Sequence, residues 1–387
     1  MKRTHKCTIL AFLFFTSCSH VRKSDQLSTE VSDTIVFNNN TVVKKAPLLK
    51  EHKYIFLETT DESLIGEITK ILYKNGLFFI LDRDVAGRLF VFDRNGKFIY
   101  NIDSKGKGFG EYVYPNDFDV DAEGKVYIQD VQSRKIVVFK DQTAVEEIKI
   151  EVPFMEVSLS DRKNQIFLYK TFKNGSLDFI FNEYDYSNRE FTDRQINADK
   201  VLNDLSIPFS SAFSLFHSKS SLNFQKRFTP DIYSYDFLAH KFKKRLFIDT
   251  DLFPKQEFIE KVRLNRELLK TEISHKFIRD ITSIYETEDF LFFNMYLNTG
   301  TIKALVNKKD KKEYYYRDLA EGVLTNTVIY GTCENNFISA YANFTDKKGF
   351  DSTLDAMQMN VEEKSRLQNI ASGDNPILVL LTYENKQ

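Results

Sequence analysis

Three aspartates at alternate positions could begin a calcium-binding loop. Asp117, Asp119 and Asp121 supply the carboxylate oxygens that such a loop uses as ligands. A loop of the EF-hand type would also need glycine and glutamate at two later positions, which here are Ala122 and Ile128. The aspartates alternate with apolar residues, which instead indicates a strand with one polar and one buried face. We therefore predict no metal site at these residues.

Three alternating glycines, Gly106, Gly108 and Gly110, could form a phosphate-binding loop. A P-loop needs Gly-Lys followed by Ser or Thr at the start of a helix, and a dinucleotide fingerprint needs a strand before it and a helix after it. Here a hairpin precedes the glycines and a strand follows them. The pattern favours a turn between two sheets, on which Glu111 and Tyr112 are held.

The histidines and serines show no catalytic spacing, and we predict no catalytic residue. The histidines of the mature chain are His20, His52, His217, His240 and His275, and no pair has metal-site spacing. Several serines surround His217 without a Gly-x-Ser-x-Gly elbow; they are Ser210, Ser211, Ser214 and Ser218. We interpret all of these as loop residues, although the histidines could still converge in space.

Asp82 and Asp130 each end an apolar strand and precede a turn that leads to an arginine. A short carboxylate can accept hydrogen bonds from the backbone N–H groups of such a turn, so we expect both aspartates to be structural. Polar residues near strand ends could instead contact a ligand. The predicted ligand-binding residues are Arg83, Arg88, Gln132, Arg134, Glu111 and Tyr112.

These residues lie within a repeated strand–turn–strand unit. Residues 79–82 and 89–93 recur as 127–130 and 136–139, and Asp82 to Asp130 is a shift of 48 residues. A unit of this kind and period is typical of one blade of a β-propeller. Six units are predicted, at about 67–112, 115–155, 166–186, 224–248 and 290–316, and from 328 to the C-terminus. The sequence therefore predicts an all-β fold, a single six-bladed β-propeller.

Turns and insertions refine this prediction. Asn95-Gly96 and Glu123-Gly124 indicate hairpins, because both pairs suit tight turns. Residues 254–269 and 353–370 are predicted to be short helical insertions. A ring of sheets has no stable free edge, so we expect residues 54–57 to pair with the last strand, 377–382, and close the propeller between the N- and C-terminal segments.

The N-terminus predicts export. Residues 1–17 resemble a signal peptide, with a basic start and an apolar run at 9–15 that is shorter than the roughly 20 residues needed to span a bilayer. Phe15-Thr16-Ser17-Cys18 resembles a bacterial lipobox, so Cys18 is the predicted lipid attachment site. An ordinary secretory signal is the alternative. Residues 18–33 are predicted to be a lipidated tether, and residues 34–387 to be the propeller.

Charge and cysteine content limit the partners. The formal net charge is −1, which does not favour nucleic acid, so membrane association would come from acyl chains. Cys333 would be the one thiol left once Cys7 is removed and Cys18 carries lipid, so no internal disulfide is expected.

Four segments carry a resemblance to a known family. They are Tyr54-Ile55-Phe56-Leu57-Glu58-Thr59-Thr60, the hairpin 92–99, the glycine segment 106–112 and the closing Asp374-Asn375-Pro376-Ile377-Leu378. Together they resemble the six-bladed β-propeller lipoproteins of Bacteroidales, which are distant relatives of NHL-repeat propellers. Phe109 stands where that family usually has proline. The resemblance implies an outer-membrane lipoprotein of the cell envelope, facing the periplasm or the cell surface, and it supplies no catalytic residues.

The expected function is non-catalytic, either binding of a small-molecule, glycan or peptide ligand or scaffolding of an envelope protein. The alternative is an NHL-like propeller enzyme, a lyase or hydrolase with a metal ion in the central channel, because propeller active sites are assembled from several blades and leave no local motif. No cofactor is otherwise predicted. A purely structural protein is a third reading, and it predicts no concave polar pocket at the channel mouth.

Overall fold

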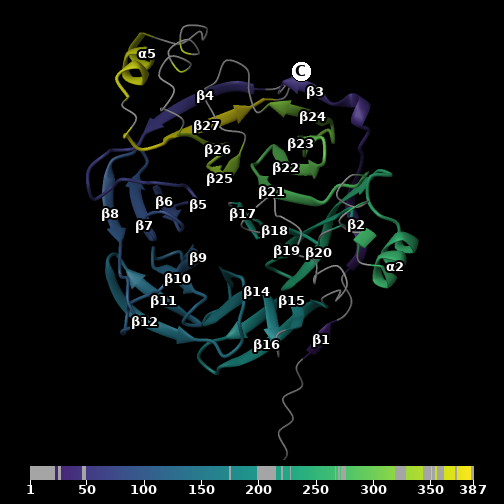
Figure 1. The fold of residues 1–387 in the computed structure, drawn as a ribbon, viewed down its shortest axis with the longest axis horizontal. Coiled ribbons are helices and arrows are strands. Elements are labelled where there is room, and N and C mark those ends of the chain that lie inside the picture. Colours follow the sequence, from purple (N-terminus) through teal and green to yellow (C-terminus); the bar gives the residue numbers. More distant parts are fainter. Residues whose placement is uncertain are drawn as a thin grey trace, which may run out of the picture.

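Six sheets are arranged as blades around a central axis (Figure 1). The computed structural model describes residues 22–24, 28–45, 49–173, 176–197, 215–218, 221–226, 228–265, 267–268, 271, 276–318, 328–342, 350, 354, 361–370 and 373–384. The predicted six-bladed β-propeller is confirmed. The predicted signal peptide and Cys18 lie outside the described residues. No helix in the described part of the chain is long and apolar enough to cross a membrane.

Blades 1 and 2 each consist of four antiparallel strands in chain order. Blade 1 contains β5 (Lys70–Lys74), β6 (Leu77–Asp82), β7 (Arg88–Asp93) and β8 (Phe98–Ile102), and blade 2 contains β9 (Pro115–Val120), β10 (Val126–Asp130), β11 (Lys135–Lys140) and β12 (Thr143–Lys149). Both predicted hairpins are confirmed. At Gly96, φ is 87° and an added Cβ would lie 2.2 Å from the carbonyl oxygen of Phe56, so this turn requires glycine.

Blades 3 to 5 have five strands each. Four strands of each follow one another: β13 (Glu156–Leu159), β14 (Gln165–Lys173), β15 (Ser176–Asp185) and β16 (Glu190–Asn197); β17 (Phe216–Ser218), β18 (Ser221–Gln225), β19 (Asp231–Asp236) and β20 (Lys241–Asp249); β21 (Asp280–Glu286), β22 (Phe290–Leu297), β23 (Gly300–Asn307) and β24 (Glu313–Asp318). The predicted units omitted the innermost strands β13, β17 and β21.

The fifth strand of each of these blades comes from the N-terminal segment. β1 (Arg22–Ser24), β2 (Ser28–Val36) and β3 (Val43–Lys45) pair in parallel with β16, β20 and β24, and the 3-10 turn η1 (Asn39–Thr41) lies between β2 and β3. The described part of the predicted tether, 22–24 and 28–33, is therefore strand, which corrects that prediction. Backbone groups can pair with an open blade edge whatever the polarity of the side chains.

Blade 6 closes the ring as predicted. It contains β25 (Ile329–Cys333), β26 (Asn336–Tyr341), β27 (Ile377–Tyr383) and, at its outer edge, β4 (Leu49–Phe56). β4 pairs antiparallel with β27, and Tyr54 lies opposite Val379. The Asn375 side chain donates to the carbonyl oxygens of Glu58 and Ser63 at 2.8 and 2.9 Å, and accepts from the Ile65 N–H at 2.8 Å. β4 and the C-terminal strand β27 are thus joined at one seam.

Two helices lie outside the ring (Figure 1). α2 (Gln256–Leu264) falls within the helix predicted at 254–269. α5 (Val361–Gln368) confirms the C-terminal half of the helix predicted at 353–370, and most of the remaining residues of that prediction lie outside the described ranges.

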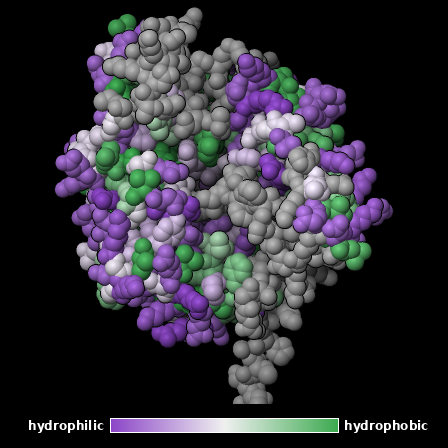
Figure 2. Space-filling view, in the orientation of Figure 1, coloured by the Kyte–Doolittle hydropathy of each residue, from purple (hydrophilic) through white to green (hydrophobic). Residues whose placement is uncertain are grey.

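Apolar side chains pack between neighbouring blades. Between blades 1 and 2, Phe79 and Leu81 of β6 pack with Phe118 of β9 and Ile128 of β10, and each is at most 1% exposed. Hydrophilic residues dominate the described part of the rim, where apolar residues form only small separate patches (Figure 2). The core is therefore divided among the interfaces between blades.

The structural role predicted for Asp82 and Asp130 is confirmed. Asp82 is fully buried and accepts the N–H groups of four residues at 2.7 to 3.0 Å. Asp130 is also fully buried and accepts three N–H groups, the shortest at 2.8 Å from Val113. Each carboxylate fixes a β-turn and the segment that enters its blade.

Candidate functional site in the central channel

The innermost strands of the blades, β5, β9, β13, β17, β21 and β25, surround the central axis (Figure 1). An unpaired inner edge leaves backbone N–H and C=O groups that need other partners. Side chains from the neighbouring blade supply several of these partners. The channel wall is therefore a polar network between blades.

The first part of this network joins blades 1, 2 and 3. Lys70 Nζ donates to Asp117 Oδ1 at 2.6 Å and to the Phe118 carbonyl oxygen at 2.8 Å. Asp117 Oδ2 accepts the Val157 N–H of β13 at 3.0 Å. Burial raises the pKa of Asp117, while Lys70 opposes that rise. The ion pair with Lys70 therefore favours the charged form of Asp117, whereas burial disfavours that form.

Similar contacts continue around the channel. Asp119 Oδ2 accepts the Leu159 N–H at 2.7 Å, and Lys74 Nζ donates to the Val120 carbonyl oxygen. Glu156 of blade 3 accepts the Leu215 N–H at 2.8 Å. Ser218 Oγ of blade 4 accepts the Glu286 N–H of blade 5 at 2.7 Å. Asp117 and Asp119 are thus in a strand, as predicted, but both are buried rather than on an exposed polar face.

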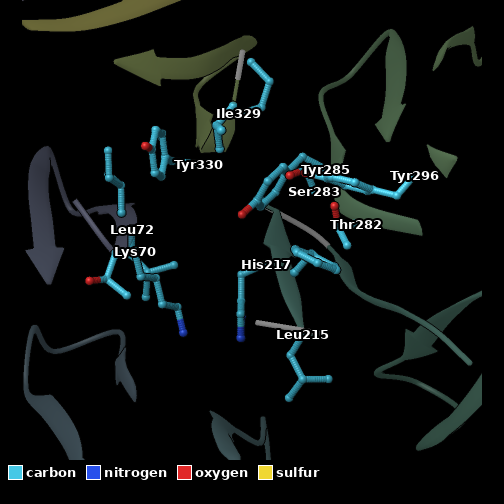
Figure 3. Close-up of a pocket in the computed structure, with 14 residues that line it drawn as sticks. Lys70, Leu72, Leu215, His217, Thr282, Ser283, Tyr285, Tyr296, Ile329 and Tyr330 are labelled. Atoms are coloured by element: carbon cyan, nitrogen blue, oxygen red, sulfur yellow. The ribbon is translucent and has the colours of Figure 1, made fainter. Parts of the chain in front are cut away.

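Two cavities follow one another along the channel. An inner cavity of about 180 Å³ is lined by apolar and polar residues, among them the tyrosines Tyr285, Tyr296 and Tyr330. A mouth cavity of about 380 Å³ lies beyond it, at the side of the β5–β6 turn. Ile71, Leu72 and His217 line both cavities, so they form the boundary between them. Lys70, His217 and Tyr285, from three different blades, lie around this space (Figure 3).

His217 is the central polar group of this site. Its Nε2 lies 4.0 Å from Asp119 Oδ2 and is buried without a hydrogen-bond partner among the described residues. Burial lowers the pKa of His217 to about 4; Asp119 opposes this shift, and Lys70 and Lys74 add to it. The imidazole is therefore neutral near pH 7, with one nitrogen as donor and the other as acceptor.

The mouth cavity combines charges of both signs with an apolar wall. Ile71, Leu72 and Tyr73 of β5 form part of the wall. The polar residues around it are Lys74, Asn75, Asp119, His217, Ser218, Thr332 and Glu334. A wider hollow of about 710 Å³ shares Lys74, Asp119 and Ser218 with the mouth and extends over blades 2 and 3. This arrangement can hold a small molecule that has both donor and acceptor groups.

The six residues predicted to bind a ligand lie away from these cavities. They belong to the β6–β7 and β10–β11 turns, the first position of β7 and the segment between β8 and β9, and none lines the three described cavities. Arg83 pairs with Asp84 at 3.0 Å, and Arg88 pairs with Asp103 at 3.2 Å. Gln132 donates its backbone N–H to Asp130, and Arg134 has a positive φ of 53°.

Glu111 and Tyr112 are held in the glycine-containing turn, as predicted. Glu111 Oε2 accepts the Gly108 N–H at 2.7 Å. The Tyr112 hydroxyl is buried and donates to the Ile102 carbonyl oxygen at 2.7 Å. These contacts explain the local structure, and ligand binding by the six residues stays a prediction.

Among the described histidines, His217 alone lines the channel cavities. His52 lies on β4 at the rim, and His240 lies in the β19–β20 turn with its Nδ1 3.7 Å from Asp161. His20 and His275 are outside the described residues, as are Ser210, Ser211 and Ser214. In the described part of the chain, no group of three or more His, Cys, Asp and Glu side chains could hold a metal ion.

Sequence reasoning missed Lys70, Lys74, Thr332 and Glu334. It interpreted His217 and Ser218 as loop residues, but both lie in the innermost strand β17. One signal could have found part of the set. Lys70 and Asp117 are 47 residues apart, which is close to the 48-residue shift of the blade repeat, and they pair with Leu81 and Gln129, so they occupy equivalent positions on neighbouring innermost strands. Charged residues at this position in consecutive units indicate side-chain contacts between neighbouring blades, on the side of the blades that faces the central axis.

Comparison with known proteins places the chain in a family. The family described as "Domain of unknown function (DUF4934)" matches residues 30–382. The chain belongs to the DUF4934 family. No curated protein matches this DUF4934 chain in sequence.

One solved structure shows the same fold. A candidate exported protein of Bacteroides fragilis is similar to this DUF4934 chain with a TM-score of 0.71 and 19% identity, over 91% of this chain and 100% of that one. Virginiamycin B lyase from Staphylococcus aureus matches with a TM-score of 0.40 and 10% identity, over 86% of this chain and 99% of that one. The first match shows a shared fold, and the second is too distant to support an argument.

Proposed function

We propose that this protein is a cell-envelope lipoprotein that is anchored through Cys18 and binds a small polar ligand at the mouth of its propeller channel, without transforming it. The mouth is the concave polar pocket that a purely structural protein would not need. It is assembled from blades 1, 2, 4 and 6, so it exists only in the closed ring.

The observation that carries the binding proposal is the position of His217 in the channel. Buried polar atoms in proteins almost always have a hydrogen-bond partner. His217 Nε2 is buried without one among the described residues, and the imidazole lines a cavity of about 380 Å³. Ligand pockets typically have volumes of roughly 300–1,000 Å³. A bound molecule would supply the partner that the described residues do not.

The envelope location has separate support. Cys18 follows an apolar run and the lipobox-like Phe15-Thr16-Ser17, and such a cysteine becomes the acylated first residue of a lipoprotein. A structure with the same fold is a candidate exported protein of Bacteroides fragilis. Labelling expressed protein with a fatty-acid analogue tests the anchor, because Cys18→Ala should abolish the label and release the protein from membranes.

Thermal shift measurements on the chain without its signal peptide would test the binding site. The probes are panels of disaccharides and dipeptides, applied to the wild type, to His217→Leu and to His52→Leu as a matched control at the rim. A ligand present at 100 times its Kd stabilises the folded state by about 2.7 kcal/mol. We expect at least one probe to stabilise the wild type and the His52 variant, but not the His217 variant.

A second variant separates loss of binding from loss of folding. Leu72→Trp should fill the mouth from the apolar side and leave His217 in place. The proposal is contradicted if the probe stabilises Leu72→Trp and His217→Leu as much as the wild type. Stoichiometric zinc or calcium in purified protein, lost together with turnover of a probe, would favour the metal-dependent lyase or hydrolase instead.

A further inference from the structure

The strand nearest to the predicted anchor is fixed to one blade. β1 pairs in parallel with β16, with Arg22 opposite Asp193, Lys23 opposite Arg194 and Ser24 opposite Gln195. β1 is therefore the outermost strand of blade 3. Figure 1 shows it on the side of the ring opposite β4 and blade 6.

The chain between the anchor and this strand is short. Cys18 and Arg22 are separated by four residue steps in the sequence. An extended chain spans at most about 3.6 Å per residue, so the Cα atoms of Cys18 and Arg22 can be no more than roughly 14 Å apart. A flexible tether that extended to residue 33 would have allowed Cys18 to lie several times farther from the ring. The acyl chains would therefore hold the rim of blade 3 close to the bilayer.

The direction of β1 identifies the part of the rim. β16 begins at Glu190, just after the β15–β16 turn. Because β1 runs parallel to β16, its first residue, Arg22, is at the end of β1 nearer to that turn. Ser187, Asn188, Arg189 and Glu190 are all exposed there. No large apolar side chain is exposed among the described side chains of β15, β16 and their turn. Such a surface suits contact with lipid headgroups rather than insertion into hydrocarbon.

We propose that the rim of blade 3, at the β15–β16 turn, is the surface that rests on the membrane, with blade 6 facing away from it. This inference rests on the proposed lipid anchor at Cys18. The β15–β16 turn is at the outer edge of the ring, on the face that carries the mouth cavity, because Tyr186 of this turn lines the wider hollow that shares Lys74, Asp119 and Ser218 with the mouth.

The absence of tryptophan makes this orientation measurable, because a single introduced tryptophan is the only indole in the protein. Asn188→Trp places it in the β15–β16 turn of blade 3. Asn95→Trp is the matched control, since Asn95 is an exposed asparagine in the β7–β8 turn, which is the equivalent turn of blade 1. Lys53→Trp marks the far rim, on β4 of blade 6.

The lipidated variants would be reconstituted into phosphatidylethanolamine–phosphatidylglycerol vesicles that contain a lipid spin-labelled at its headgroup. We expect fluorescence of the indole at position 188 to be quenched several-fold more than at positions 95 and 53. The same variants with Cys18→Ala should show equal and weak quenching. Circular dichroism and melting curves check that each variant is folded.

Flotation of the vesicles separates the two ways in which this could fail. If flotation does not depend on Cys18, the proposed lipid anchor is wrong. If flotation depends on Cys18 but quenching is equal at positions 188, 95 and 53, the anchor is right and the docking surface is wrong. Stronger quenching at position 53 or 95 than at 188 would also overturn the docking surface.

Discussion

Lys70 and Asp117 occupy equivalent positions in neighbouring blades and form an ion pair across the blade boundary, with Nζ 2.6 Å from Oδ1. The pair is almost fully buried. Because this contact joins equivalent positions in consecutive repeats, the same two side chains contribute to the channel wall and to the packing of blade 1 on blade 2.

Lys70→Met should destabilise the protein near neutral pH. It leaves the buried Asp117 carboxylate without its partner, and breaking a buried pair costs about 3–5 kcal/mol. Burial already raises the pKa of Asp117, and loss of Lys70 raises it further. The folded state then binds more protons than the unfolded state, so the penalty grows as pH rises through the folded-state pKa. Urea denaturation across pH measures this, and a pH-independent loss would contradict it.

His217→Leu should remove part of the acid sensitivity of folding. The pKa of His217 lies at about 4 in the folded state and 6.5 in its ordinary range. Between these values the unfolded state binds more protons, so wild-type stability falls as pH falls from 6.5 to 4. The loss is on the order of 3 kcal/mol. Parallel stability curves for the wild type and the variant would show that His217 does not titrate in this way.

Asp33→Asn should loosen β2 from the outer edge of blade 4. Asp33 Oδ2 accepts from Lys311 Nζ at 2.9 Å and is paired with Arg245. Burial alone would raise the pKa of Asp33, but these two cations lower it below its ordinary value. Loss of the charge should cost about 2 kcal/mol, as for hydrogen bonds to charged groups.

Hydrogen exchange of the β2 amides measures that loosening. The control is Asp251→Asn, because the Asp251 side chain is 99% exposed and lies 4.0 Å from Lys255. Faster exchange in β2 is expected for the Asp33 variant alone. Equal protection of β2 in both variants would mean that β2 is held by other contacts, such as the burial of Ile35.

Asn375→Ala should weaken the seam of the ring. The side chain makes three hydrogen bonds that join the segments before β27 and after β4. At about 1 kcal/mol each, their loss predicts a destabilisation of about 3 kcal/mol. Asn369→Ala, which removes one exposed hydrogen bond to Ser365, serves as the control. Equal denaturation midpoints for the two variants would show that the pairing of β4 and β27 alone holds the seam together.

The repeat, the hairpins and the closing strand could be predicted because their signals are local: apolar strands such as β6 and β10, and turns such as Asn95-Gly96. The innermost strand β17 was missed because it has three residues, and β13 and β21 were missed because buried polar residues such as Glu156 and Thr282 interrupt their apolar pattern. Parallel pairing of β1 and β2 was missed because its partners lie about 170 to 215 residues away and leave no pattern in the segment itself. The channel site depends on these same strands.

The order in which β1 to β4 meet the blades delays the completion of the fold. The segment that is synthesised first pairs with β16, β20, β24 and β27, all of which lie later in the chain than blades 1 and 2. The backbone groups of this segment therefore lack their partners until most of the chain has been made, and the delay grows with sequence separation. Newly made protein would be exposed to aggregation during that interval, and a chaperone that shields extended segments would shorten it.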